Sequence, residues 1–532
     1  MLPALNDRSS PSVQAGTGLR QKSIDYQIAS DWKNFLFLSA ICCNFLPVSV
    51  MAQGILAPSD PGSVETHEKI GGDTSAKGLP NGVTDNSEAP DAFTEILGRD
   101  KLLGDMGGLR TLLGNYGVTL TLNDMSVIMG NTSGGINKGT TYSGLTTLTL
   151  QMDTQKALGW EGGSVNFSAL QTRGRNLSQY YIANLQTVSN IAAEPTTRLW
   201  EIWYQQAFDD DAFDVRIGQQ SIDQEFMTSQ AAFLHFNSSM GWAALPSYDL
   251  YGGGPVYPLS SLGVRLRMKP TDAITLLAGV FQDNPAGGTF YQDTQLLGST
   301  RWGGNFNLRT GALFITEAQY AIYQTPKDAP ADAVMPDGLP GIYKIGAWFD
   351  TAAFPNQRYD TLGVPLANPA SNGNPQLNRY NFSLYALFDQ TIWQPDPKGA
   401  RAITIFARAM GAPDDRNLIS YSVNGGINLS APLPDRDNDT FGVGFGVAQI
   451  STGGINYNKD QNFYRTTPGP VPIRNSETFL EVTYQIQATP WLQIQPVFQY
   501  IMNPSGGIAN PNNPNLRVKN AAIFGFSTGV TF

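Results

Sequence analysis

Polar and aromatic side chains occupy every second position in several short segments of this chain. In RLWEIWYQQAF, residues 198–208, Glu201, Trp203 and Gln205 alternate with isoleucine and tyrosine. Because residues two apart lie on the same face of a β-strand, such a segment has one polar and one apolar face. Carboxylate and amide groups exchange hydrogen bonds with hydroxyl groups, and the indole ring offers a flat surface for stacking. The pattern therefore suits reversible contact with hydroxyl-bearing solutes.

The same alternation assigns further side chains to polar faces. These candidates are Arg216, Gln171, Arg173, Arg265, Arg267, Glu317, Lys344 and Trp348. The pattern is weakest for Glu317, which shares a face with Leu313 and Ile315. Each charged candidate has an alternative interpretation as a solvated residue of a loop or rim. Trp203 has an alternative as an aromatic residue at a membrane interface.

Covalent and metal chemistry have little support in the sequence. The chain has two histidines, His67 and His235, and neither a G-x-S-x-G nor an H-E-x-x-H pattern occurs. Glycine at every second position within residues 441–447 indicates a strand with a small face, not a phosphate-binding loop. Carboxylates are frequent enough that composition alone leaves a glycosidase open. We expect no enzyme activity, no catalytic or metal site and no cofactor.

The composition favours strands joined by turns. Charged residues make up 15% of the chain, whereas glycine and proline are plentiful, at 55 and 34 residues. The formal net charge of −10 argues against a nucleic-acid partner, which would require a basic surface.

The N-terminal part predicts export. An apolar run, NFLFLSAICCNFLPVSVMAQG, follows Lys33 and ends in a small-residue pattern, so we expect cleavage after Ala52. The alternative is a membrane anchor. Both cysteines, Cys42 and Cys43, lie in this run, so a cleaved chain would contain no disulfide.

Four segments follow from these signals. Residues 1–52 form an export signal with an N-terminal extension, and the Pro- and Gly-rich residues 53–97 form a flexible polar tether. Residues 98–116 carry leucines at helical spacing and predict a short periplasmic helix. Residues 117–532 contain strands and turns almost without exception.

The strands of residues 117–532 predict a barrel in a membrane. No apolar run after Ala52 reaches the roughly 18 residues of a transmembrane helix, which excludes a helical membrane protein. Tight turns such as 208–213 alternate with long polar connections such as 173–197, the layout of an outer-membrane barrel. Counting gives about seventeen strands, but both chain ends must meet at the same rim, so we assign RWGGNFNL, residues 301–308, to a loop. We therefore predict an all-β fold, a transmembrane antiparallel β-barrel of about sixteen strands, wide enough for a water-filled channel.

The cost of exposing a charge to lipid helps to decide which strand faces point into the barrel. Arg216 and Glu201 lie mid-strand, where a charge facing lipid costs about 2–4 kcal/mol, so the lumen is the more favourable side for them.

The connection 221–261 is too long and too apolar for a freely solvated loop. We expect it to fold into the barrel and narrow the channel, with a lip on the outer rim as the alternative. Its candidate constriction residues are Phe233, His235, Asn237 and Trp242.

Several blocks of the sequence resemble the carbohydrate-selective porin family, the OprB-like porins. They include GWEGGSVNFSALQTRGRNLS (159–178), RLWEIWYQQAF (198–208), VRIGQQSIDQEF (215–226), GIYKIGAWFDT (341–351) and EVTYQIQATPWLQIQPVFQYIMNPSG (481–506). They occur in order within a resemblance that covers roughly residues 98–532.

The resemblance implies a sixteen-stranded porin of the bacterial outer membrane. It would let mono- and oligosaccharides diffuse passively into the periplasm while its outer face contacts membrane lipid. The C-terminal Phe532 resembles the signal that the barrel-assembly machinery recognises. A monomer and a homotrimer both remain open.

Three alternatives to a sugar-preferring porin remain. A general diffusion porin for small polar solutes would conduct ions without interference from added sugar. An exported soluble carbohydrate-binding β-protein would leave cells without detergent. A barrel hydrolase would depend on His235.

Overall fold

The structure, a computed structural model, describes residues 92–290, 302–304, 308–324, 337–397, 399–466 and 469–532. All of them belong to one of the two compact units of the chain, which runs from Ser49 to Phe532. The predicted export signal and residues 53–91 of the predicted tether lie outside the described residues.

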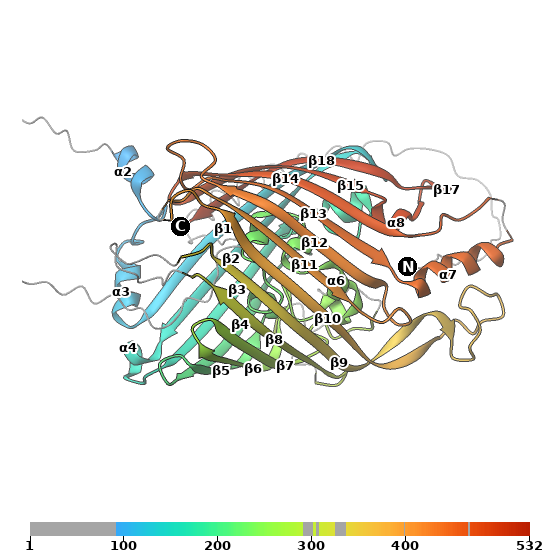
Figure 1. Ribbon diagram of the computed structural model, residues 1–532, viewed down its shortest axis with the longest axis horizontal. Helices are drawn as coiled ribbons and strands as arrows, with labels where there is room; N and C mark the ends of the chain where they lie inside the picture. Colours follow the sequence, from blue (N-terminus) through green and yellow to red (C-terminus); the bar gives the residue numbers. More distant parts are fainter. Residues whose placement is uncertain (1–91, 291–301, 305–307, 325–336, 398, 467–468) are drawn as a thin grey trace, which may run out of the picture. The chain divides into compact units, whose positions relative to one another are not determined.

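Sixteen antiparallel strands close into a barrel, which confirms the predicted fold class (Figure 1). The last strand pairs with the first, with Thr531 opposite Asn123. The described part of 301–308, residues 302–304 and 308, contains no strand. The barrel strands are β1 (Val118–Gly135), β2 (Gly139–Asp153), β3 (Gly163–Gly174), β4 (Thr196–Phe208), β5 (Phe213–Gln220), β6 (Ser261–Thr271), β7 (Ile274–Gln282), β8 (Ala312–Ile322), β9 (Gly341–Asp360), β10 (Pro375–Trp393), β11 (Ala402–Gly411), β12 (Ile419–Ser430), β13 (Thr440–Ile450), β14 (Ser476–Thr489), β15 (Leu492–Met502) and β18 (Lys519–Thr531).

The remaining elements lie in the connections. A small two-stranded sheet pairs β16 (Ala509–Asn510) with β17 (Asn513–Arg517). The helical segments are α2 (Ala92–Gly98), α3 (Leu109–Asn115), α4 (Thr154–Leu158), η1 (Ser178–Ile182), η2 (Ile222–Gln224), η3 (Ala231–Leu234), α5 (Ser238–Gly241), α6 (Ala244–Asp249), η4 (Tyr251–Gly253), α7 (Thr452–Phe463) and α8 (Pro504–Gly507). None of the helices in the described ranges is both long and apolar enough to span a membrane.

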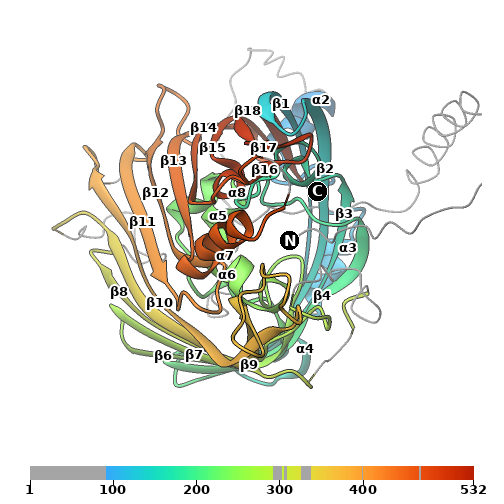
Figure 2. The ribbon, with the colours of Figure 1, turned by 90° about the vertical axis from the view of Figure 1, so that its right-hand side faces the viewer.

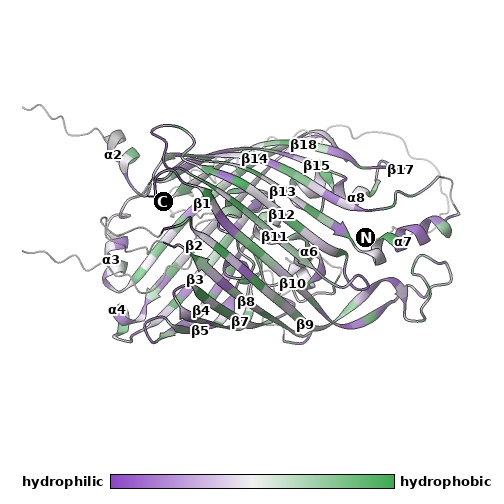
Figure 3. Cartoon of the chain, viewed as in Figure 1, coloured by the Kyte–Doolittle hydropathy of each residue, from purple (hydrophilic) through white to green (hydrophobic). Residues whose placement is uncertain are grey.

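The wall of the barrel has an apolar outer face and a more polar inner face. Along β15, Pro496 is exposed on the outside, whereas Gln495 and Gln499 are buried on the inside. The alternation of hydrophobic and hydrophilic residues recurs along the strands in Figure 3. The apolar residues of each strand therefore form the outer surface of the barrel, and the interior receives the amides and charges.

The connections differ in length at the two ends. One end has short turns, such as 209–212, 272–273 and 490–491, and the other has long connections, such as 175–195 and 221–260. Three connections depart from this pattern: 136–138 and 412–418 are short at the long-loop end, and 323–340 is long at the short-turn end. In outer-membrane barrels the short turns face the periplasm, so the difference in connection length indicates that the short-turn end is the periplasmic end.

The N-terminal helices lie at the short-turn end, beside the C-terminus (Figure 1). The amide of Leu102 donates to the carbonyl of Thr531 at 2.9 Å, and the indole Nε1 of Trp491 donates to the carbonyl of Ile96 at 2.9 Å. α3 lies within the helix predicted at 98–116, whereas α2 occupies the last residues of the segment predicted as tether.

Candidate functional site

Residues 221–260, which connect β5 to β6, lie inside the barrel and are called the infolded loop. Figure 2 shows α5 and α6 of this loop within the ring of strands. Its apolar side chains pack in two clusters against inward-facing wall residues. Trp242 belongs to a cluster with Trp348, and Phe236 belongs to another with Phe479. The burial of these aromatic rings stabilises the loop inside the barrel.

Carboxylates on the inner wall hold the backbone of the infolded loop. Each is buried and accepts hydrogen bonds from loop N–H groups, which are stronger than bonds between neutral groups. The bonds are Ser221 N–H to Glu201 at 2.8 Å, Met227 N–H to Glu317 at 2.7 Å, Gln230 N–H to Asp389 at 2.8 Å, and Phe236 and Asn237 N–H to Glu481, both at 2.8 Å.

Cationic side chains of the wall bind the same loop through its carbonyls and one carboxylate. Lys344 Nζ donates to the carbonyl of Thr228 at 2.8 Å. The loop's Glu225 forms ion pairs with Arg216 at 3.2 Å and Arg265 at 2.7 Å. Wall charges of both signs therefore fix the position of the loop.

Several side chains that the sequence assigned to the channel lining are thus covered by the loop. Arg265 has no exposed surface, and it also pairs with Asp214, as does the partly buried Arg267. Glu317 faces inward although it shares its face with Leu313 and Ile315, because those two side chains pack against the infolded loop.

Trp203 lies on the inner face of β4 and is only partly buried. The guanidinium carbon of Arg216 is 4.1 Å from the centre of its ring, within the range of a cation–π contact. Gln205 accepts hydrogen bonds from Arg216 at 2.9 and 2.8 Å. The three side chains form one rigid polar and aromatic group.

Gln171 and Arg173 lie on the outer face, not in the lumen as the sequence analysis assigned them. β3 continues its alternation without a bulge against β2, so both residues share the face of Phe167, which is 39% exposed. Arg173 forms an ion pair with Asp124 on the outer face of β1. The assignment failed because it did not carry the orientation of Phe167 forward along the strand.

The four candidate residues of the infolded loop have different positions. The His235 ring contacts Glu481 Oε1 at 3.1 Å and Asn428 Oδ1 at 3.2 Å. Asn237 caps α5 by accepting from Ser239 N at 3.1 Å. Phe233 lines a cavity, and Trp242 donates to the carbonyl of Gly253 at 3.0 Å.

The glycine face of β13 gives the infolded loop its space. A Cβ at Gly444 would lie 2.5 Å from Met240 Cε and 2.9 Å from the His235 ring. A Cβ at Gly442 would lie 2.5 Å from Leu234. Two of the glycines predicted to form a small strand face, Gly442 and Gly444, therefore lie where the infolded loop closely approaches the wall.

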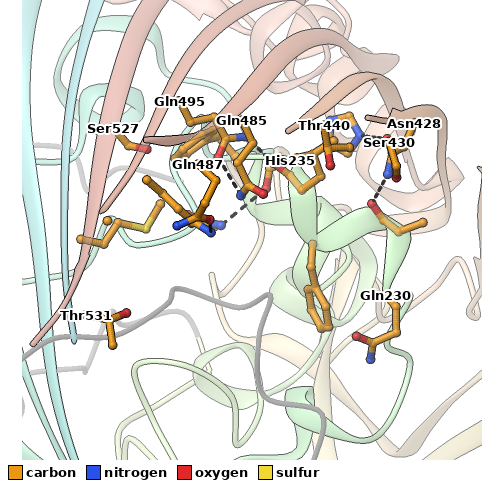
Figure 4. A pocket seen from close by; sticks show the side chains of 18 of the residues that line it. Gln230, His235, Asn428, Ser430, Thr440, Gln485, Gln487, Gln495, Ser527 and Thr531 are labelled. Carbon is orange, nitrogen blue, oxygen red and sulfur yellow. Dashed lines mark hydrogen bonds between the residues drawn. The ribbon is translucent and has the colours of Figure 1, made fainter. Parts of the chain in front are cut away.

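A cavity of about 590 Å³ lies between the infolded loop and the short-turn ends of the strands. Figure 4 shows Gln485, Gln487 and Gln495 close together on one side and Gln230 on the other. Gln493 Nε2 donates to Gln487 Oε1 at 2.8 Å, so amides of β14 and β15 form a cross-strand pair. The lining is Met125, Asn190, Gln230, Ala231, Phe233, Leu234, His235, Phe236, Asp389, Thr404, Asn428, Ser430, Thr440, Gln485, Gln487, Pro490, Trp491, Gln493, Gln495, Ser527, Gly529, Val530 and Thr531.

The cavity lining is almost entirely neutral. The carboxylate in the lining, Asp389, accepts hydrogen bonds from the hydroxyl of Ser229 and the backbone N–H of Gln230. The remaining polar groups are amides, hydroxyls and the His235 imidazole, and Phe233 and Trp491 add aromatic surface. Such a set can exchange hydrogen bonds with a neutral polyhydroxyl solute and contact the apolar faces of its ring.

Several residues that position the infolded loop or the neighbouring connection 175–195 were not among the sequence-predicted candidates. Arg408 donates to the carbonyls of Met227 at 2.7 Å and Gly241 at 2.8 Å. Glu477 accepts from the amides of Leu185 and Gln186, each at 2.7 Å. Strand alternation predicts that both side chains point into the barrel, but it does not reveal their partners in distant loops.

Comparison with known proteins decides the family. The family model described as "Carbohydrate-selective porin, OprB family" matches residues 137–532, which include most of the barrel. The chain belongs to this family. Porin B of Pseudomonas aeruginosa is 24% identical over 425 residues, covering 76% of this chain and 87% of that protein. The putative porin QuiX of Acinetobacter baylyi is 25% identical over 429 residues, covering 77% and 89%.

A solved structure has the same fold. The high-pH structure of Pseudomonas putida OprB has a TM-score of 0.69 and 23% sequence identity, with 82% of this chain and 99% of that chain covered. This carbohydrate-selective porin is therefore a sugar-selective channel of the bacterial outer membrane, which confirms the resemblance, the location and the function expected from the sequence. Family and fold indicate a channel rather than an enzyme.

Proposed function

We propose that sugars cross this porin by passive diffusion through the amide-lined cavity beneath the infolded loop. The observation that carries the proposal is the lining itself, in which neutral amides and hydroxyls surround Phe233 and Trp491. A hydrated ion gains little from such groups, whereas a sugar can exchange its water hydrogen bonds for them one at a time. Weak, replaceable contacts let the solute enter and also leave.

We also propose a division of roles among the inward-facing residues. Trp203 and Arg267, which are partly exposed, contact sugars on the β4–β6 side of the channel. The buried inward-facing residues act as positioning residues for the infolded loop and its neighbours. They are Glu201, Gln205, Arg216, Arg265, Glu317, Lys344 and Trp348. The constriction is then set by the loop that these residues hold.

The remaining expectations from the sequence stay proposals. They are export by residues 1–52, a tether up to α2, a periplasmic position for α2 and α3, outer contact with membrane lipid, and recognition of Phe532 by the assembly machinery.

The test of the cavity uses neighbouring positions on β15. Gln493→Leu removes an amide from the cavity at nearly constant size, and Ile494→Leu changes the outer face as the matched control. Losing one hydrogen bond of about 1 kcal/mol predicts a roughly fivefold higher half-saturating sugar concentration for Gln493→Leu. Block of ion current by added glucose in planar bilayers measures this concentration. An unchanged value in Gln493→Leu would contradict the proposed path.

A further inference from the structure

The chain before the first strand contacts the end of the last strand at the short-turn end of the barrel. We call residues 96–110 the rim clasp; they run from the end of α2 to the second residue of α3. Gly107 and Gly108 have φ angles of 68° and 94°, in the left-handed region that glycine adopts readily. They let the chain turn between the two helices, which both lie at the rim beside the C-terminus (Figure 1).

Arg110 joins the rim clasp to the first and last strands. Its guanidinium donates to the main-chain oxygens of Gly104 within the clasp and Phe532 after β18, and its Nε donates to the carbonyl of Leu120 on β1 at 3.5 Å. Hydrogen bonds from a charged donor are stronger than those between neutral groups. One side chain therefore connects the clasp with both edges of the seam where the barrel closes.

The rim clasp also contacts two residues of the cavity lining. The carbonyl of Ile96 accepts a hydrogen bond from the indole Nε1 of Trp491 at 2.9 Å, and the N–H of Leu102 donates to the carbonyl of Thr531 at 2.9 Å. Trp491 and Thr531 both line the cavity. An indole has a single polar hydrogen, so the bond to Ile96 restricts how the ring of Trp491 can turn.

The position of Trp491 makes its orientation important for solutes. It lies in the short turn between β14 and β15, so its ring lines the cavity at the short-turn rim. Aromatic rings contact the apolar faces of a sugar through their own faces. A side chain that is already held in one orientation loses less conformational entropy when it makes such a contact.

We propose that the rim clasp forms the short-turn end of the sugar path and positions the Trp491 ring there as a contact surface for sugars. The inference rests on the proposed passage of sugars through the cavity. Trp491 touches the sugar, whereas Arg110 is a positioning residue that acts by holding the clasp. The path then includes a segment that precedes the first strand of the barrel.

Glucose added to one side of a planar bilayer tests the rim clasp, with the porin inserted in one direction. Arg110→Ala removes the bonds that hold the clasp, and Trp491→Phe keeps an aromatic ring but removes the N–H that Ile96 binds. Each variant should lower the association rate of glucose added at the short-turn side roughly threefold, because the ring is no longer held for contact. The association rate from the long-loop side should not change. Analysis of current noise measures both rates.

Two matched variants serve as controls. Lys101→Ala removes an exposed cation from the clasp itself, and Trp160→Phe removes an indole N–H from a 60% exposed residue in another connection at the short-turn end. Both should have wild-type association rates from either side. Wild-type rates in Arg110→Ala and Trp491→Phe, or equal changes from the two sides, would overturn the inference. A lower unfolding temperature in Arg110→Ala with unchanged rates would also overturn it, because the clasp would then only stabilise the barrel.

The Gln493→Leu variant separates this inference from the proposed function. A raised half-saturating glucose concentration in Gln493→Leu, together with unchanged rates in both clasp variants, would overturn the role of the rim clasp alone. An unchanged concentration in Gln493→Leu would overturn the path through the cavity, and the role of the clasp with it.

Discussion

Single charged side chains inside this barrel act mainly on backbone groups. Glu481 illustrates this: it is fully buried on β14, and it accepts hydrogen bonds from two consecutive amides of the infolded loop and from Gln499 Nε2 at 2.8 Å. A buried carboxylate needs such donors, because an unpaired charge in the interior is costly. The same bonds fix the loop at one point on the wall.

Glu481→Ala should loosen the infolded loop without unfolding the barrel. Hydrogen bonds to a charged group contribute about 1.5–3 kcal/mol each, and the variant loses several of them. We expect a larger and noisier single-channel conductance in planar bilayers, with weaker discrimination between sugars and salts. Glu161→Ala, in the exposed turn after α4, is the control. A Glu481→Ala channel with wild-type conductance would show that the carboxylate does not hold the loop.

Strand alternation predicted the face of most residues but not their partners. It placed Glu201, Arg216 and Lys344 inside correctly by parity, yet it could not reveal that a loop from elsewhere in the chain would cover them. That contact depends on tertiary structure, which two-residue periodicity does not encode. The misplacement of Gln171 and Arg173 arose because the outward orientation of Phe167 was not carried forward along β3.

At the level of elements, the infolded loop and the glycine face of β13 form a matched pair. The length and apolarity of residues 221–261 predicted burial, and the glycines predicted a small face, but only the fold brings the two together. The wall lacks side chains at Gly442 and Gly444, where the side chains of Leu234, His235 and Met240 lie against it.

Gly444→Val should push the infolded loop off the wall. Its Cβ would lie 2.5 Å from the flexible end of Met240 and 2.9 Å from the His235 ring, and that ring is tied to Glu481 and Asn428 and has little room to shift. We expect faster proteolysis of the loop and an altered conductance, with the heat-modifiable mobility of a folded barrel retained. Gly411→Val is the control, because the nearest atom to its Cβ would be 3.6 Å away. Equal proteolysis of the two variants would contradict the matched packing.

At the level of the whole molecule, the fold was largely predictable because a transmembrane barrel imposes simple constraints. Chain ends at one rim require an even number of strands, and the barrel has sixteen; the described residues of 301–308 form no strand. Loop lengths predicted which end faces the periplasm. The contact of α2 and Leu102 with the last strands was not predictable, since it joins regions at opposite ends of the sequence.

At the level of the whole molecule, the proposed path implies a channel whose selectivity comes from neutral amides and aromatic rings. Selectivity of this kind depends on hydroxyl groups and ring faces rather than on size or charge alone. A general diffusion pore with the same fold would sort solutes by size and charge.

Liposome swelling with the wild-type porin tests this account most directly. Proteoliposomes would be placed in isotonic solutions of a monosaccharide and of an uncharged or zwitterionic non-sugar of similar size, such as an amino acid. We predict swelling several times faster with the monosaccharide. Equal swelling rates for the two solutes would contradict the account.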